Sequence, residues 1–171
     1  MSIRYRQAEP ADAEAIAQVH VDSWYAAYAS FVPTHVLEAR SVKDLQVFWK
    51  TALEKQPESV IVAENDAGDI VGWISFGICK DEPDTAELFA IYNRPDHFRS
   101  GVGTGLWQFA RQRLQETGLS VVKVLVFTQA TPARRFYESV GFKLVEGSES
   151  VFEWHGENLE DVRYEYRFED A

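Results

Sequence analysis

The feature that most constrains the fold is a glycine-rich turn, FRSGVGTG at residues 98–105, placed between a predicted strand and a predicted helix. The aromatic and apolar run at 86–92 indicates the strand, and apolar residues at helical spacing after the turn indicate the helix. Gly118 stands where a left-handed residue ends such a helix, and the β-branched run at 121–127 predicts the next strand. Because a long helix separates them, the two strands are predicted to be parallel, joined by a right-handed crossover.

The rest of the chain supplies further helices and strands, indicated by hydrophobic period and turn residues. The expected elements are a strand at 3–6, a helix opened by Pro10 and ended or redirected by Pro33, a helix from Ser41 to about Lys55, an antiparallel hairpin of strands 60–64 and 70–78, a short helix between Thr131 and Gly141, and two tail strands at 142–154 and 162–168. No internal repeat or linker interrupts this order. Residues 1–171 are therefore expected to form a single domain of the α/β (α+β mixed) class.

The composition excludes several classes of protein. Hydrophobic residues make up 46% of the 171, and no apolar run approaches the roughly 20 residues that a membrane-spanning helix needs. A net charge of −10 disfavours nucleic acid and anionic lipid, so neither nucleic acid nor membrane is predicted as a partner. A single cysteine, Cys79, and an N-terminus without a secretory signal indicate a cytoplasmic setting.

The glycine turn offers a place for an anionic ligand. A helix N-terminus presents unpaired N–H groups, and glycines let a pyrophosphate approach them closely; the alternative is that the glycines only make a tight turn. Residues 94–143 hold eight basic and three acidic side chains, which favours an anion. A P-loop would need a lysine after the glycines, and a dinucleotide fingerprint would need a glycine at Leu106, so both are disfavoured.

Several stretches of the sequence resemble one family. The turn at 98–103 fits Q/R-x-x-G-x-G/A from its glycines onward, and ARRFYESVGF at 133–142 follows in the expected order. Shorter stretches also fit, namely IR at 3–4, PAD at 10–12 and SWYAAY at 23–28. The chain thus resembles the GNAT superfamily of acetyl-CoA-dependent N-acetyltransferases. The resemblance implies a GNAT-like central mixed, mostly antiparallel sheet of about 6–7 strands with a splayed parallel pair, flanked by about four helices.

The resemblance also implies that acetyl-CoA lies between the splayed strands as a cosubstrate. Its pantetheine would pair with the backbone near Ile91, and its phosphates would meet the N–H groups of the turn and basic side chains such as Arg135. Phe98 replaces the family's Gln or Arg and Ala130 replaces its pantetheine-binding asparagine, and both changes bear on cofactor affinity. The predicted cofactor-binding residues are Ile91, Tyr92, Asn93, Phe98, Arg99, Ser100, Gly101, Val102, Gly103, Thr104, Ala130, Arg134 and Phe136.

Acetyl transfer to an amine needs a base for the ammonium and an acid for the departing thiolate. Tyr137 resembles the family tyrosine near the thioester sulfur, where a phenol can donate to the thiolate; as an alternative, it is a core aromatic beside Phe136. Glu87, at the start of the strand that leads to the glycine turn, is the predicted base, acting directly or through water, and otherwise a solvated strand-edge residue.

Aromatic residues of the first helix are candidates for the acceptor pocket. Trp24, Tyr25 and Tyr28 fall where family members build that pocket, and their rings suit an aliphatic or cationic amine, with core packing as the alternative. His20 is interpreted as a core residue on the same stripe. No metal site is predicted, since the remaining histidines, His35, His97 and His155, lack partners at ligand spacing.

These observations predict an N-acetyltransferase that moves an acetyl group to a primary amine, such as a small cationic amine or a peptide N-terminus, directly in a ternary complex. Two alternatives stay open: a non-catalytic acyl-CoA binding or sensing module, and a nucleotide-binding protein. The predicted partners are acetyl-CoA and an amine acceptor. The aromatic tail either completes the sheet or forms the seam of a homodimer; its rings are Phe152, Trp154, Tyr164, Tyr166 and Phe168.

Overall fold

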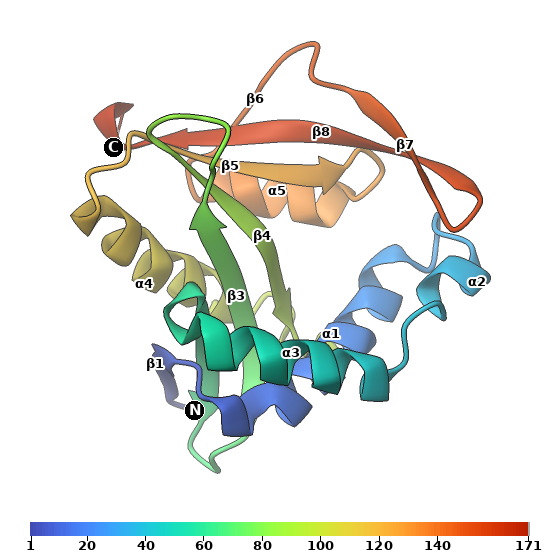
Figure 1. The fold of residues 1–171 in the computed structure, drawn as a ribbon, viewed down its shortest axis with the longest axis vertical. Coiled ribbons are helices and arrows are strands. Elements are labelled where there is room, and N and C mark those ends of the chain that lie inside the picture. The colour runs from blue at the N-terminus through green and yellow to red at the C-terminus, as the bar shows by residue number, and fades with distance from the viewer. Residues whose placement is uncertain (171) are drawn as a thin grey trace.

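The computed structural model describes residues 1–170, which are organised around one eight-stranded sheet (Figure 1). The strands are β1 (Ile3–Gln7), β2 (Val60–Asn65), β3 (Ile70–Ile78), β4 (Thr85–Asn93), β5 (Val121–Phe127), β6 (Lys143–Leu144), β7 (Ser150–Trp154) and β8 (Glu157–Arg167). The α-helices are α1 (Ala13–Tyr28), α2 (Thr34–Leu37), α3 (Val42–Lys55), α4 (Val102–Glu116) and α5 (Thr131–Ser139). The strand order is β1-β2-β3-β4-β5-β8-β6, with β7 paired to β8.

One parallel pair stands at the centre of this sheet. β4 and β5 pair in parallel only from Thr85 opposite Val121 to Leu88 opposite Val124, and the other pairs are antiparallel. Beyond Leu88 the two strands continue without pairing to each other. The predicted mixed, mostly antiparallel sheet with a splayed parallel pair is therefore confirmed.

Two layers of helices cover opposite faces of the sheet. Alternate residues of β2 show the division, because Ile61 packs into the core under α4 and α5 whereas Val62 packs into the core under α1 and α3. In Figure 1, α1 and α3 cross in front of β3, and α5 lies behind β5. Aromatic residues fill both cores, and Trp73 and Tyr164 are among the largest fully buried side chains.

Local signals in the sequence explain most element ends. Ser41 caps α3, because its hydroxyl accepts from the Asp44 N–H at 3.1 Å while the Asp44 carboxylate accepts from the Ser41 N–H. Gly118 and Gly141, which follow α4 and α5, have φ angles of 79° and 103°, a conformation that glycine adopts without strain. The predicted bounds of β5 match the structure at both ends.

The C-terminal region differs from the prediction. The prediction of one strand at 142–154 is wrong. Two short strands, β6 and β7, lie there instead, separated by a loop in which Gly147 has a φ of 75°. The last strand begins at Glu157, because His155 and Gly156 both have positive φ and form a two-residue hairpin turn between β7 and β8. Tyr164 and Tyr166 then enter the core of their own chain, so the tail completes the sheet.

The first helical region was expected to be ended or redirected by Pro33. α1 ends at Tyr28, and a turn precedes the short α2. Among the helices of residues 1–170, none combines the length and the apolar character needed to cross a membrane.

Candidate active site

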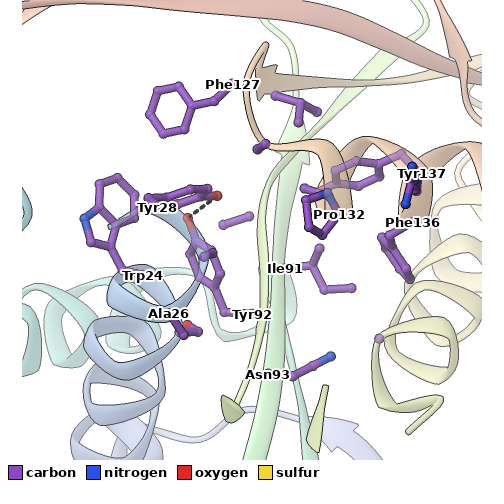
Figure 2. A pocket seen from close by; sticks show the side chains of 18 of the residues that line it. Trp24, Ala26, Tyr28, Ile91, Tyr92, Asn93, Phe127, Pro132, Phe136 and Tyr137 are labelled. Carbon is purple, nitrogen blue, oxygen red and sulfur yellow. Dashed lines mark hydrogen bonds between the residues drawn. The ribbon is translucent and has the colours of Figure 1, made fainter. Parts of the chain in front are cut away.

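The splay of β4 from β5 opens into a cavity of about 940 Å³. Its walls come from β4, β5, α1, α5 and the loop that leads into α4, and Figure 2 shows their side chains converging on it. A cavity of this size lies within the range of sites for cofactor-sized molecules. Because β4 has no partner strand beyond Leu88 on this side, its backbone edge faces the gap and can pair with an extended, amide-bearing ligand.

The glycine turn leads into the start of α4, where backbone N–H groups could bind an anion. The first intrahelical bond runs from the Gly105 N–H to the Gly101 carbonyl, so the N–H groups of residues 101–104 precede the helical ladder. No side chain caps Gly101. Positive φ angles at Arg99 and Gly101, 59° and 88°, turn neighbouring N–H groups in the manner of a backbone nest for anions.

Asn93 and Phe136 hold the start of α4 close to the sheet. With its amide oriented to satisfy both neighbours, Asn93 accepts from the Gly103 N–H at 3.3 Å and donates to the Tyr92 carbonyl at 3.2 Å. A Cβ added to Gly103 would lie 3.1 Å from the Asn93 amide and 3.2 Å from the Phe136 ring. Gly103 is therefore the residue that lets helix, strand and α5 meet beside the cavity.

The structure gathers most of the predicted cofactor residues around this cavity. Those lining it are Ile91, Tyr92, Asn93, Phe98, Arg99, Gly103, Ala130 and Phe136. Among the described residues, the predicted set outside the lining comprises Ser100, Gly101, Val102, Thr104 and Arg134.

Two adjacent arginines of α5 take different directions. Arg134 donates to the Tyr164 hydroxyl and to the Thr128 carbonyl, both at 3.0 Å, which ties α5 to β8 and to the end of β5. Arg135 instead lines the cavity. Arg135 is therefore better placed than Arg134 to meet an anion there.

Three tyrosines bring their phenols together in the cavity wall. The Tyr28 and Tyr92 hydroxyls lie 3.3 Å apart, and Tyr137 reaches the same space from α5 (Figure 2). Burial raises the pKa of each phenol above its ordinary value, and the Tyr28 phenol adds to the pKa increase of Tyr92 and of Tyr137. Tyr137, only 6% exposed, thus stays a neutral hydrogen-bond donor over the whole working pH range.

Glu87 does not reach the cavity lining. Its neighbours on β4, Ala86 and Leu88, point into the core under α4, so Glu87 faces the opposite side of the sheet. There it lies opposite Lys123 in the parallel register, and its charge contributes to the raised pKa of that lysine. Phe89, two residues further along β4, does line the cavity.

One side of the cavity is a wall of aromatic rings. Trp24 and Tyr28, both predicted, line it, and their ring centroids lie 4.8 Å apart. Tyr25, also predicted, packs instead in the cluster around Val36 and Leu159, outside the lining. Trp24 and Tyr28 were predicted either to pack in the core or to line the acceptor pocket. Both are partly buried in a core cluster, and both also line the cavity.

His20 belongs to the packing behind this wall. Its Nδ1 accepts from the Trp49 indole N–H at 3.3 Å, and its ring stacks on Tyr92 at 5.3 Å. Burial and the charge of Arg40 lower the pKa of His20 to about 4. The interpretation of His20 as a core residue is consistent with this environment.

Sequence reasoning missed several residues that line the cavity, among them Phe127, Phe152 and Asp161. Phe127 packs on Tyr28 with centroids 5.0 Å apart, and Asp161 on β8 pairs directly opposite Phe127. Only the register of β5 with β8 brings Asp161 here, and the sequence carried no signal for that register.

The arrangement defines a class of protein. A cavity between splayed parallel strands, an open strand edge and an anion-binding helix start suit a long ligand with amide and phosphate groups, and the tyrosines suit chemistry at its far end. Comparison with known proteins gives the particular family. A sequence model of the Acetyltransferase (GNAT) family matches residues 16–142, and the chain belongs to that family. It is an acetyltransferase with acetyl-CoA as its cosubstrate.

Individual relatives agree with this assignment. The Bacillus subtilis protein called uncharacterized N-acetyltransferase YuaI is 32% identical over 162 residues, which cover 94% of this chain and 90% of the relative. PaiA N-acetyltransferase of Thermoplasma acidophilum, solved in complex with coenzyme A, is 22% identical with a TM-score of 0.77, covering 98% of this chain and 100% of that one. YncA of Salmonella typhimurium, solved with its cofactor acetyl-CoA, is 19% identical with a TM-score of 0.74, covering 98% and 94%. The two solved structures share the fold of this chain.

Proposed function

We propose that residues 1–171 act as one domain that transfers the acetyl group of acetyl-CoA to the primary amine of a small cationic acceptor or a peptide N-terminus. The transfer is direct, within a ternary complex. The observation that carries this proposal is a single cavity that joins the start of α4, the Tyr137 phenol and the aromatic wall of α1. Donor and acceptor can therefore meet in one space, which direct attack requires.

Donor binding rests on backbone and arginine groups. The open edge of β4 at Ile91 and Asn93 faces the cavity and offers N–H and carbonyl groups to the pantetheine amides. Apart from the Gly103 N–H, which donates to Asn93, the N–H groups of residues 101–104 and the Arg135 side chain offer donors to the phosphates. The relatives solved with coenzyme A and with acetyl-CoA support the same donor for this chain.

Tyr137 is the proposed acid for the leaving thiolate. A thiol of ordinary pKa near 8.5 is a stronger acid than this buried phenol, whose pKa is raised, so complete proton transfer from phenol to sulfur is uphill. Its role is then to donate a hydrogen bond to the negative charge that develops on sulfur. The raised pKa helps this role, because the phenol never ionises and so never repels that charge.

Glu87 as the base that takes the amine proton stays a prediction. The carboxylate lies beyond the cavity lining. It can receive the proton only through intervening water, which is an ordinary route for general base catalysis.

Release of free coenzyme A thiol tests the proposal directly. Purified protein is mixed with acetyl-CoA and a panel of primary amines, and the acetylated product is identified by mass spectrometry. At least one amine should accelerate thiol release well above hydrolysis. If no amine does so while calorimetry detects tight binding of coenzyme A, the non-catalytic binding module is favoured. Equal affinity for ADP and acetyl-CoA would instead favour a nucleotide-binding protein.

A further inference from the structure

Asp161 gives the acceptor side of the cavity a negative charge. Among the described residues that line the cavity it alone carries a carboxylate, whereas the lining arginines, Arg99 and Arg135, come from the loop before α4 and from α5. Asp161 instead comes from β8, opposite Phe127 of β5. The cavity is thus polarised, with cationic groups on the walls proposed to hold phosphates and an anionic group beside the aromatic wall.

Among residues 1–170, no ion pair or hydrogen bond joins a cationic side chain to Asp161. Arg163, the next residue on the same face of β8, donates to both carboxylate oxygens of Glu82, at 3.0 and 2.9 Å, and its Nε donates to Glu165. Burial and the neighbouring charge of Glu160 raise the pKa of the Asp161 carboxyl group. Asp161 is partly buried, and a partly buried carboxylate without a cationic partner is stabilised by a positively charged ligand.

Aromatic rings connect Asp161 to the proposed reaction centre. Phe127, directly across from Asp161, contacts Tyr28 at 5.0 Å and Trp24 at 6.2 Å between centroids. Tyr28 in turn lies near enough to Tyr137 for its charge to affect the pKa of that phenol. A methylene chain can therefore cross the rings of Phe127 and Tyr28, with one end at Tyr137 and the other at Asp161.

A second, smaller cavity extends the acidic character beyond Phe127. It has a volume of about 310 Å³, shares Phe127 with the main cavity, and includes Glu157 and Glu160 in its lining. A ligand with further positive charges would meet carboxylates on both sides of Phe127. Fields of one sign in a cavity with apolar walls concentrate ligands of the opposite sign.

From this geometry we infer that Asp161 binds a second positive charge of the acceptor, and that the preferred acceptors are α,ω-diamines or longer polyamines rather than monoamines. This inference rests on the proposed function and names its substrate class. One amino group reacts beside Tyr137 while the other, as an ammonium, donates to the Asp161 carboxylate. Asp161 is then a specificity-determining residue that takes no part in the transfer itself.

The test compares diamines with monoamines of equal length. Values of kcat/KM are measured at saturating acetyl-CoA for putrescine against n-butylamine and for cadaverine against n-pentylamine. Wild type should prefer each diamine, and Asp161→Asn should lose roughly 10- to 100-fold of kcat/KM for the diamines, mainly through KM, as expected for one charge-assisted hydrogen bond. Its values for the monoamines should stay within about twofold, because a monoamine has no group for Asp161.

Glu153→Gln is the matched control. Glu153 lies on the neighbouring strand β7 and is exposed, while Phe152 and Trp154 on either side of it pack inward, so this variant removes the same charge outside the cavity. Both amine classes should react with it as with wild type. Asp161→Ser provides a second substitution should the asparagine variant lose its fold.

Three results would overturn the inference: no diamine preference in wild type, equal losses for both amine classes in Asp161→Asn, or the same selective loss in Glu153→Gln. Should no amine be acetylated, the proposed function fails, and Asp161 is judged by calorimetry of putrescine binding to the coenzyme A complex. Binding by wild type that is weakened at least tenfold in Asp161→Asn supports the cation site. Equal binding, or none to either protein, rejects it.

Discussion

Replacing Tyr137 by phenylalanine removes one hydroxyl and leaves the ring in place. The ring packs against Phe136 and Phe142, with centroids 5.3 and 5.4 Å away, and neither contact involves the hydroxyl. The cavity therefore keeps its shape apart from one oxygen. We expect the free energy of unfolding to change by no more than about 1 kcal/mol, because the variant loses a hydroxyl without losing packed surface.

The catalytic effect should be much larger than the effect on stability. Loss of a single preorganised donor to a developing charge costs about 10²- to 10³-fold in rate, and a neutral phenol belongs near the lower end. We therefore expect kcat to fall about 100-fold, which corresponds to about 2.7 kcal/mol of transition-state stabilisation. KM for acetyl-CoA should stay within about twofold, since the donor acts on charge that is absent from the bound ground state.

Single-turnover acetylation, with enzyme in excess over acetyl-CoA, is the suitable assay because product release does not limit it. Tyr164→Phe is the matched control. Its hydroxyl donates to Glu138 at 2.8 Å and accepts from Arg134 at 3.0 Å, outside the cavity, so this variant should lose about 1–3 kcal/mol of stability and keep its turnover rate. An unchanged single-turnover rate in Tyr137→Phe would refute the assignment of Tyr137 as the donor to the thiolate.

Three further predictions concern the base, the phosphate loop and acid stability. Glu87→Gln should lower kcat/KM for amines roughly tenfold or more; an unchanged kcat/KM would exclude Glu87 as the base. Gly103→Ala should weaken acetyl-CoA binding about tenfold in calorimetry, because the new Cβ displaces Asn93 or Phe136, while helix propensity maintains stability; unchanged affinity would contradict this packing. The pKa of His20 lies near 4 in the folded state and near 6.5 in the unfolded state. Between these pH values the unfolded state therefore binds one more proton than the folded state. Urea denaturation should show the free energy of unfolding falling by up to about 3 kcal/mol from pH 6.5 to 4. His20→Gln should flatten that slope, and an equally steep slope would assign it to other groups.

The parts of the fold that could be predicted are those encoded by local chemistry. The capping pair Ser41 and Asp44 and the helix-ending Gly118 act within a few residues, so their consequences follow from the sequence. The hairpin at His155 and Gly156 escaped prediction because it needs positive φ at a histidine, a conformation that L-residues with a side chain rarely adopt. Without that turn, β7 and the start of β8 could not be separated.

The sequence predicted many residues that line the cavity, from β4, α1 and α5 as well as from the glycine turn, but not the direction of every side chain. Side-chain direction decided the rest, as the neighbours Arg134 and Arg135 demonstrate. One residue along a helix rotates the side chain by about 100°, which suffices to send one guanidinium to Tyr164 and the other to the cavity. Asp161 required more still, because only the pairing of two strands far apart in sequence places it beside Phe127.

The aromatic wall also explains why the central strands remain apart. Tyr92 on β4 and Phe127 on β5 both contact Tyr28 of α1, so a ring from the helix layer stands between strand ends that would otherwise pair. Closing the gap would force these rings out of contact, and the register shift between β3 and β4, where Ser75 pairs with Ala90 but Phe76 pairs with Leu88, also bends β4 at this point. The same rings that line the cavity therefore help to hold it open. For Tyr28, core packing and lining the cavity are therefore not alternatives, because the packed ring is itself part of the cavity wall.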